Sequence, residues 1–166
     1  MEIPILLAAC MGLRRSEIVG LKWDKIDFES NTLSIKEAIV YGENYEVYVK
    51  KPKSTAGDRT LDMPKIVADA LKRQPRTSEY VVNIDGNGIY KRFTRLLKNN
   101  AIPHFRFHDL RHYNASVMLA LGVPDKYAME RMGHATNVML KQVYQHTMQD
   151  EQKKISEHLN SYFSGD

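Results

Sequence analysis

The hydrophobic pattern of this 166-residue chain changes at Pro64. Ahead of Pro64, segments rich in β-branched and aromatic residues, separated by turn residues, predict strands over 23–28, 32–39, 45–49 and 59–63. From Pro64 onward, apolar residues recur mainly at helical spacing, and proline suits the first position of a helix. The pattern predicts a mainly helical α+β domain with a small antiparallel sheet near its N-terminal half.

The remaining elements are predicted from the same spacing and from helix start and stop residues. Apolar residues from Ile3 to Met11 predict a helix ended by Gly12, and a short helix follows from Ser16. Later helices are expected from Pro64 to the break at Gln74, from Asp85 to the residues ahead of Pro103, over 108–121, from Pro124 to Gly133, after Thr136 or Asn137, and over 149–163.

Composition excludes several classes of protein. Hydrophobic residues make up 43% of the chain and charged residues 27%, which is the balance of a globular domain. No apolar stretch approaches the roughly 20 residues of a membrane helix, and no signal-peptide pattern is present, so a cytoplasmic protein is expected. Cys10 is the single cysteine, which excludes an intramolecular disulfide and a cysteine-cluster zinc site. The net charge of +4 permits a polyanionic partner without requiring one.

The densest group of candidate functional residues is His108-Asp109-Leu110-Arg111. On a helix, His108 and Arg111 are three residues apart, so both side chains reach one face. A permanent guanidinium charge beside a titratable imidazole suits a phosphate, because arginine binds the oxygens and histidine can transfer a proton. A capped helix start with solvated charges is the alternative explanation of so short a motif.

His108 and His112 are four residues apart, which is also a spacing of metal ligands. A zinc site would need a third ligand and usually a glutamate base, as in His-Glu-x-x-His. Asp109 stands where that glutamate is needed, and Arg111 would place a positive charge beside the metal. We therefore expect no metal here.

Other short motifs contain residues of related chemistry. They are Gly12-Leu13-Arg14 with Ser16-Glu17, Pro52-Lys53-Ser54 ahead of a predicted strand, Gly133-His134, and Tyr144. Each has an ordinary explanation when taken alone: solvated charge for the arginine and the lysine, a helix end for Gly-His, and packing for the tyrosine.

In this order, the motifs resemble those of the tyrosine recombinase family, the phage-type integrases. The similarity runs from Met11 to about Thr147, and Met132-Gly133-His134 stands where the family has Leu-Gly-His. The resemblance implies a catalytic domain that cuts and rejoins DNA. The catalytic positions that it implies are Arg14, Lys53, His108, Arg111, His134 and Tyr144. Lys51 stands close enough to Lys53 to be the alternative lysine.

The resemblance also implies a role for each residue. Tyr144 would attack a phosphodiester and hold the DNA as a phosphotyrosine. The two arginines would contact nonbridging oxygens and take the place of the metal used by many phosphoryl-transfer enzymes. The histidines would orient the phosphate and help to move the tyrosine proton, and Lys53 would protonate the leaving 5′ oxygen. Because the exchange is nearly balanced in energy, no cofactor is expected.

Partners implied by the resemblance are double-stranded DNA, further copies of the chain in a tetrameric synapse, and an accessory excision factor, with no membrane. Residues 1–166 are expected to form one catalytic domain, a fragment without the N-terminal core-binding domain. The helix over 149–163 would contact a neighbouring protomer or pack on its own core. The alternatives are a type IB topoisomerase, which Gly-Leu-Arg-Arg-Ser-Glu disfavours, and a DNA-binding module without catalysis, which the retained catalytic residue types disfavour.

Overall fold

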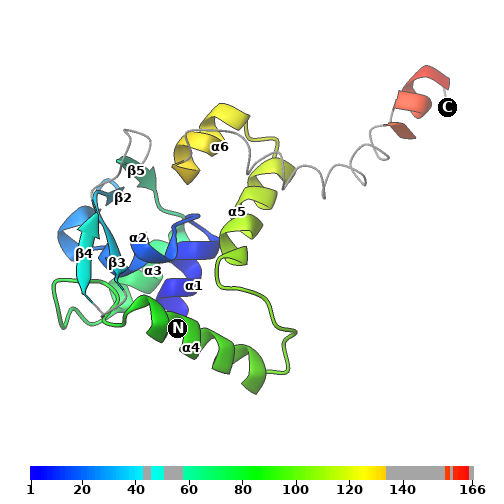
Figure 1. The fold of residues 1–166 in the computed structure, drawn as a ribbon. Helices are drawn as coiled ribbons and strands as arrows, with labels where there is room; N and C mark the ends of the chain where they lie inside the picture. The colour runs from blue at the N-terminus through cyan, green and yellow to red at the C-terminus, as the bar shows by residue number, and fades with distance from the viewer. Residues whose placement is uncertain (43–45, 51–57, 134–155, 158, 165–166) are drawn as a thin grey trace.

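The computed structural model describes residues 1–42, 46–50, 58–133, 156–157 and 159–164, and within them a mixed fold (Figure 1). Within these residues two helices come first, five short strands follow, and the helices α3 to α6 come after the strands. The bounds are α1 (Glu2–Ala9), α2 (Arg15–Gly20), β1 (Ile26–Asp27), β2 (Thr32–Ile35), β3 (Ala38–Tyr41), β4 (Val47–Lys50), β5 (Arg59–Asp62), α3 (Lys65–Arg73), α4 (Gly86–Asn99), α5 (Asp109–Ala120) and α6 (Asp125–Met132). The predicted fold class, mainly helical with antiparallel strands in the N-terminal half, is confirmed.

The strands form two antiparallel sheets, where the sequence predicted one. The first has the order β1-β2-β5, with Leu33 opposite Leu61, and the second pairs β3 with β4. The strand predicted over 32–39 is divided at Lys36 and Glu37, so its halves join different sheets. The first predicted strand begins as a 3-10 turn, Trp23–Lys25, and only Ile26–Asp27 pairs.

One large apolar core lies among α1, α2, β2, β3, β5, α3 and α4, and is called the main core below. Leu7, Ile18, Leu33 and Ile89 are fully buried in it. Each comes from a different element. Alternate residues of β2 and β5 are buried, so one face of that sheet packs inward; Leu33, Ile35 and Leu61 on this face are apolar, and Arg59 is its charged member. The main core therefore fixes α1, α2 and β5 relative to one another.

A second, smaller cluster joins α5 to α6, and is called the corner. Its buried members are Ala115, Met118, Ala128 and Met132. The corner contacts the rest of the domain where α5 lies against α1 and α6 lies against β5 (Figure 1). Few apolar side chains are buried there, so polar contacts carry much of the attachment.

Outside the two sheets, Tyr80 forms an isolated antiparallel bridge with Lys22. The helix expected after Thr136 lies outside the described residues. In the part of the chain that the structure describes, none of the helices has the length and apolar character needed to cross a membrane.

Candidate active site

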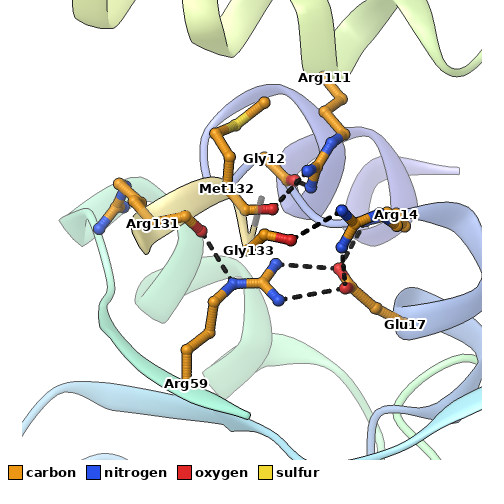
Figure 2. A network of polar contacts seen from close by, with 8 residues as sticks. All are labelled: Gly12, Arg14, Glu17, Arg59, Arg111, Arg131, Met132 and Gly133. Atoms are coloured by element: carbon orange, nitrogen blue, oxygen red, sulfur yellow. Dashed lines mark hydrogen bonds and ion pairs between the residues drawn. The ribbon is translucent and has the colours of Figure 1, made fainter. Parts of the chain in front are cut away.

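The C-terminal end of α6 is surrounded by arginine side chains (Figure 2). Gly133 ends the helix in the left-handed region, with φ of 63°, and the last carbonyls of a helix lack partners within it. Arg59 Nε donates to the Arg131 carbonyl at 2.9 Å, Arg111 donates to the Met132 carbonyl, and Arg14 Nη2 donates to the Gly133 carbonyl at 2.9 Å. Consecutive carbonyls thus accept from different guanidinium groups, which also suit the negative end of the helix dipole.

Arg14 is held at the N-terminus of α2. Its backbone N–H donates to Glu17 Oε2 at 2.8 Å, and its Nη1 donates to Glu17 Oε1 at 2.8 Å. The turn before it requires glycine: Gly12 has φ of 70°, and a Cβ there would lie 2.7 Å from Met132 Sδ. The left-handed turn at Gly12 therefore allows the end of α1 to lie close to the end of α6.

Arg111 lies on α5 and is completely buried. Its guanidinium donates to the carbonyls of Gly12 and Met132, so it joins the α1–α2 turn to the end of α6. Burial lowers the pKa of Arg111 to about 9, with Arg14 also lowering it and Glu17 opposing. At neutral pH the guanidinium therefore keeps its charge.

Asn114 supports the same junction from the next turn of α5. Its Nδ2 donates to the carbonyl of Ala9, the last residue of α1, at 2.9 Å. Because Arg111 and Asn114 are three residues apart, one face of α5 contacts the end of α1 and the turn that follows it.

Glu17 is the buried acid at the centre of the cluster. Arg59 Nη1 donates to its Oε1 at 3.1 Å and Arg59 Nη2 donates to its Oε2 at 3.0 Å, a paired contact of guanidinium and carboxylate. Burial raises the pKa of Glu17, but the hydrogen bonds and charges of Arg59 and Arg14 lower it by more, so the net pKa lies below its ordinary value. Glu17 is therefore an anion shared by two cations.

His108 stands just before α5 and, unlike Arg111, is exposed. Its ring meets that of His112 edge to face, with 5.0 Å between the centroids. Partial loss of solvent lowers the pKa of His108, and the charges of His112 and Arg111 lower it further. The imidazole is therefore neutral at pH 7 and able to accept a proton.

The predicted site residues have three outcomes. Arg14 and Arg111 come together at adjacent carbonyls, and His108 precedes the helix that carries Arg111. Arg15, the residue after Arg14, donates instead to the Gly86 carbonyl at 3.3 Å. Lys53, its alternative Lys51, His134 and Tyr144 lie outside the described residues, as does most of the predicted helix 149–163.

Glu17 and Arg59 were not predicted as site residues. Glu17 stands three residues after Arg14, at the position where an acid commonly accepts from the first N–H of a helix, and that spacing was a usable signal. Arg59 begins a strand with alternating burial, and no local pattern distinguishes a buried arginine there from an exposed one. Within the described ranges, no group of three or more His, Cys, Asp or Glu side chains is arranged to hold a metal ion.

Comparison with known proteins identifies the family. The model of the phage integrase family matches residues 2–151, which is most of the chain. The chain belongs to the phage integrase family. Its resemblance to the tyrosine recombinases, inferred from the order of short motifs, is thereby confirmed.

Relatives of this integrase-family chain include a protein named tyrosine recombinase XerC-like from Caldanaerobacter subterraneus subsp. tengcongensis, 28% identical over 189 residues. That alignment covers 95% of this chain and 48% of the relative. The putative prophage phiRv2 integrase of Mycobacterium tuberculosis is 26% identical, with 92% of this chain and 44% of the relative covered. The chain thus spans about half the length of these relatives.

Among solved structures, the chain is similar to the Tn1549 transposon integrase in complex with circular intermediate DNA. The TM-score is 0.79 at 23% identity, over 95% of this chain and 58% of that one. At this identity the similarity establishes the shared fold.

Proposed function

We propose that this chain is the catalytic part of a site-specific DNA recombinase that integrates or excises a mobile element. In the proposed reaction, the Tyr144 oxygen attacks a DNA phosphodiester, forms a 3′-phosphotyrosine bond and breaks the bond to the 5′ oxygen. The tyrosine proton is lost to a base, and the 5′ oxygen gains one. A 5′ hydroxyl from another strand then reverses the exchange, so no energy-rich cofactor is consumed.

The observation that carries the proposal is the convergence of Arg14 and Arg111 at the end of α6. Their guanidinium groups donate to the adjacent carbonyls of Gly133 and Met132, and the next residue along the chain is His134. Both groups are planar and charged at neutral pH. Arg14 is partly exposed and can contact a nonbridging oxygen of the phosphate directly, while the buried Arg111 adds positive charge beside it. Such groups stabilise the added negative charge of a pentacoordinate transition state.

The other proposed roles follow from the chemistry of each side chain. His108, neutral at pH 7, and His134 orient the phosphate and accept the tyrosine proton. Lys53 donates a proton to the leaving 5′ oxygen. The neutral state of His108 supports its role as acceptor, because a protonated imidazole has no site left for the proton.

Double-stranded DNA is the proposed substrate, bound in the cytoplasm by several copies of the chain. The exposed side of α4 supports DNA binding, since it carries Lys91, Arg92, Arg95 and Lys98. The end of the chain supports contact with a neighbouring protomer: Leu159, Tyr162 and Phe163 are exposed, the last two by about 80%.

Covalent trapping tests the proposal. The chain is incubated with a nicked duplex built from the ends of the mobile element that carries the gene, so that cleavage releases a short strand and leaves a protein–DNA adduct. Tyr144→Phe removes the nucleophilic oxygen and should abolish the adduct. The matched control is Tyr127→Phe, because Tyr127 lies exposed on α6. An adduct that persists in Tyr144→Phe and disappears in Tyr127→Phe would contradict the assignment.

A further inference from the structure

Arg59 connects the elements that meet at the arginine cluster, although it is buried and is not itself part of a predicted motif. It is the first residue of β5 and only 8% exposed. We propose that Arg59 is a positioning residue for DNA cleavage: through Glu17 it orients the Arg14 guanidinium, and through the Arg131 carbonyl it holds the end of α6 that precedes His134. This inference rests on the proposed recombinase function.

The contacts of Glu17 show how Arg59 reaches Arg14. Oε1 accepts from Arg14 Nη1 at 2.8 Å and from Arg59 Nη1 at 3.1 Å. Oε2 accepts from the Arg14 backbone N–H at 2.8 Å and from Arg59 Nη2 at 3.0 Å. The planar fork of Arg59 therefore fixes the rotation of the carboxylate, and the fixed carboxylate sets the direction of the Arg14 side chain.

Charge balance explains why Arg14, rather than Arg59, is suited to meet a phosphate. Both guanidinium groups share the single negative charge of Glu17, so a positive charge remains on the pair. The Arg14 side chain is 34% exposed and the Arg59 side chain 7%. An incoming anion therefore reaches Arg14, while Arg59 acts through Glu17.

The second contact of Arg59 extends its influence to α6. Its Nε donates to the Arg131 carbonyl at 2.9 Å, two residues before Gly133, whose carbonyl accepts from Arg14. One buried side chain thus ties β5 to α2 and to the end of α6 (Figure 2).

The test measures adduct formation and DNA affinity separately in Arg59→Lys and Arg59→Met. Arg59→Lys keeps a positive charge beside Glu17, so it should fold even if Arg59→Met does not. A lysine cannot reproduce the paired contact, so the cleavage rate constant should fall about tenfold or more while the Kd for DNA stays within about twofold. Arg73→Lys is the matched control, because Arg73 pairs with Glu2 on the exposed surface and should change neither quantity.

A second pair of measurements asks whether Arg59 acts through Arg14. In an Arg14→Ala background, Arg59→Lys should cost less than about threefold, because the group that it positions is already gone. An equal loss in both backgrounds would overturn the proposal, as would an unchanged cleavage rate in Arg59→Lys.

An NMR measurement separates this proposal from the recombinase function. If the parent chain forms no adduct, the recombinase function is wrong. The order parameter of the Arg14 Nε–H group then still tests whether Arg59 holds the Arg14 side chain in place. That group should lose order in Arg59→Lys and keep it in Arg73→Lys. Equal order in both variants would overturn the positioning role.

Discussion

The main core and the corner are built in different ways. In the main core, apolar side chains from seven helices and strands pack together, and Leu7, Ile18 and Leu33 are fully buried. In the corner, four buried residues join α5 to α6. Arginine side chains supply further contacts between the end of α6 and the rest of the domain (Figure 2).

This difference indicates that the two regions have different roles. Apolar packing has no direction and supplies most of the stability of a domain, whereas hydrogen bonds from guanidinium groups fix orientation and supply charge. The groups that attach the corner include Arg14 and Arg111, whose positive charges are proposed to stabilise the phosphate. The candidate site therefore lies at the seam between the two regions.

The largest expected effect comes from a cavity in the main core. Leu7→Ala should lower the free energy of unfolding by about 2–5 kcal/mol, because Leu7 is completely buried. The change in the free energy of unfolding is measured by denaturant unfolding, followed by circular dichroism and by Trp23 fluorescence. Leu159→Ala is the control, since Leu159 is half exposed and should change stability by less than about 0.5 kcal/mol. A small loss in Leu7→Ala would mean that the main core does not dominate stability.

Substitution of Gly12 tests how closely the corner packs against the rest of the domain at this seam. Gly12→Ala should cost about 1–3 kcal/mol, because its φ is 70° and the added Cβ would lie 2.7 Å from Met132 Sδ and 2.9 Å from Asn114 Oδ1. Gly122→Ala is the matched control: its φ is 67°, with no atom within 4 Å of the added Cβ. Thermal unfolding of both variants gives the difference, which reports crowding at the seam. Equal losses would show that the seam tolerates the extra carbon.

The orienting role of the arginines is tested by Arg111→Lys. Cleavage should fall by at least about tenfold, or 1.4 kcal/mol in the barrier, because an ammonium group lacks the planar fork. The adduct rate on the nicked duplex measures it. Arg106→Lys is the control, because Arg106 is exposed and pairs with Asp109 near the start of the same helix. Near-normal cleavage by Arg111→Lys would mean that Arg111 contributes only its positive charge and not its planar geometry.

The smallest expected effect is on the loss of stability at acidic pH. The pKa of Glu17 is lower in the folded chain than its ordinary value of 4.5, which holds when the chain is unfolded. Its contribution to stability is therefore complete above pH 4.5 and is lost as the pH falls through the lower folded-state pKa. Glu17→Gln should remove this part of the acid dependence, as measured by unfolding from pH 7 to pH 3. An identical pH profile in parent and variant would contradict the paired contact.

Some features of the fold and the candidate site could be predicted from the sequence, and others could not. Arg14 and Arg111 were identifiable because each lies in a short motif, Gly-Leu-Arg and His-x-x-Arg, and the family comparison confirms the resemblance inferred from those motifs. The division of the strand 32–39 into β2 and β3 was missed, because both halves have the same β-forming composition. Arg59 was missed as a site residue because its partner Glu17 is 42 residues away in the chain.

The sequence by itself determined the fold class and the family, because periodicity and short motifs are local properties of a chain. Only the tertiary structure decided which charges share a site. Arg14, Arg59 and Arg111 come from three separate segments and meet at the end of α6, with Glu17 as the anion between Arg14 and Arg59. Charged groups are buried only where partners and hydrogen bonds offset the loss of water, and those partners are supplied by packing between distant elements.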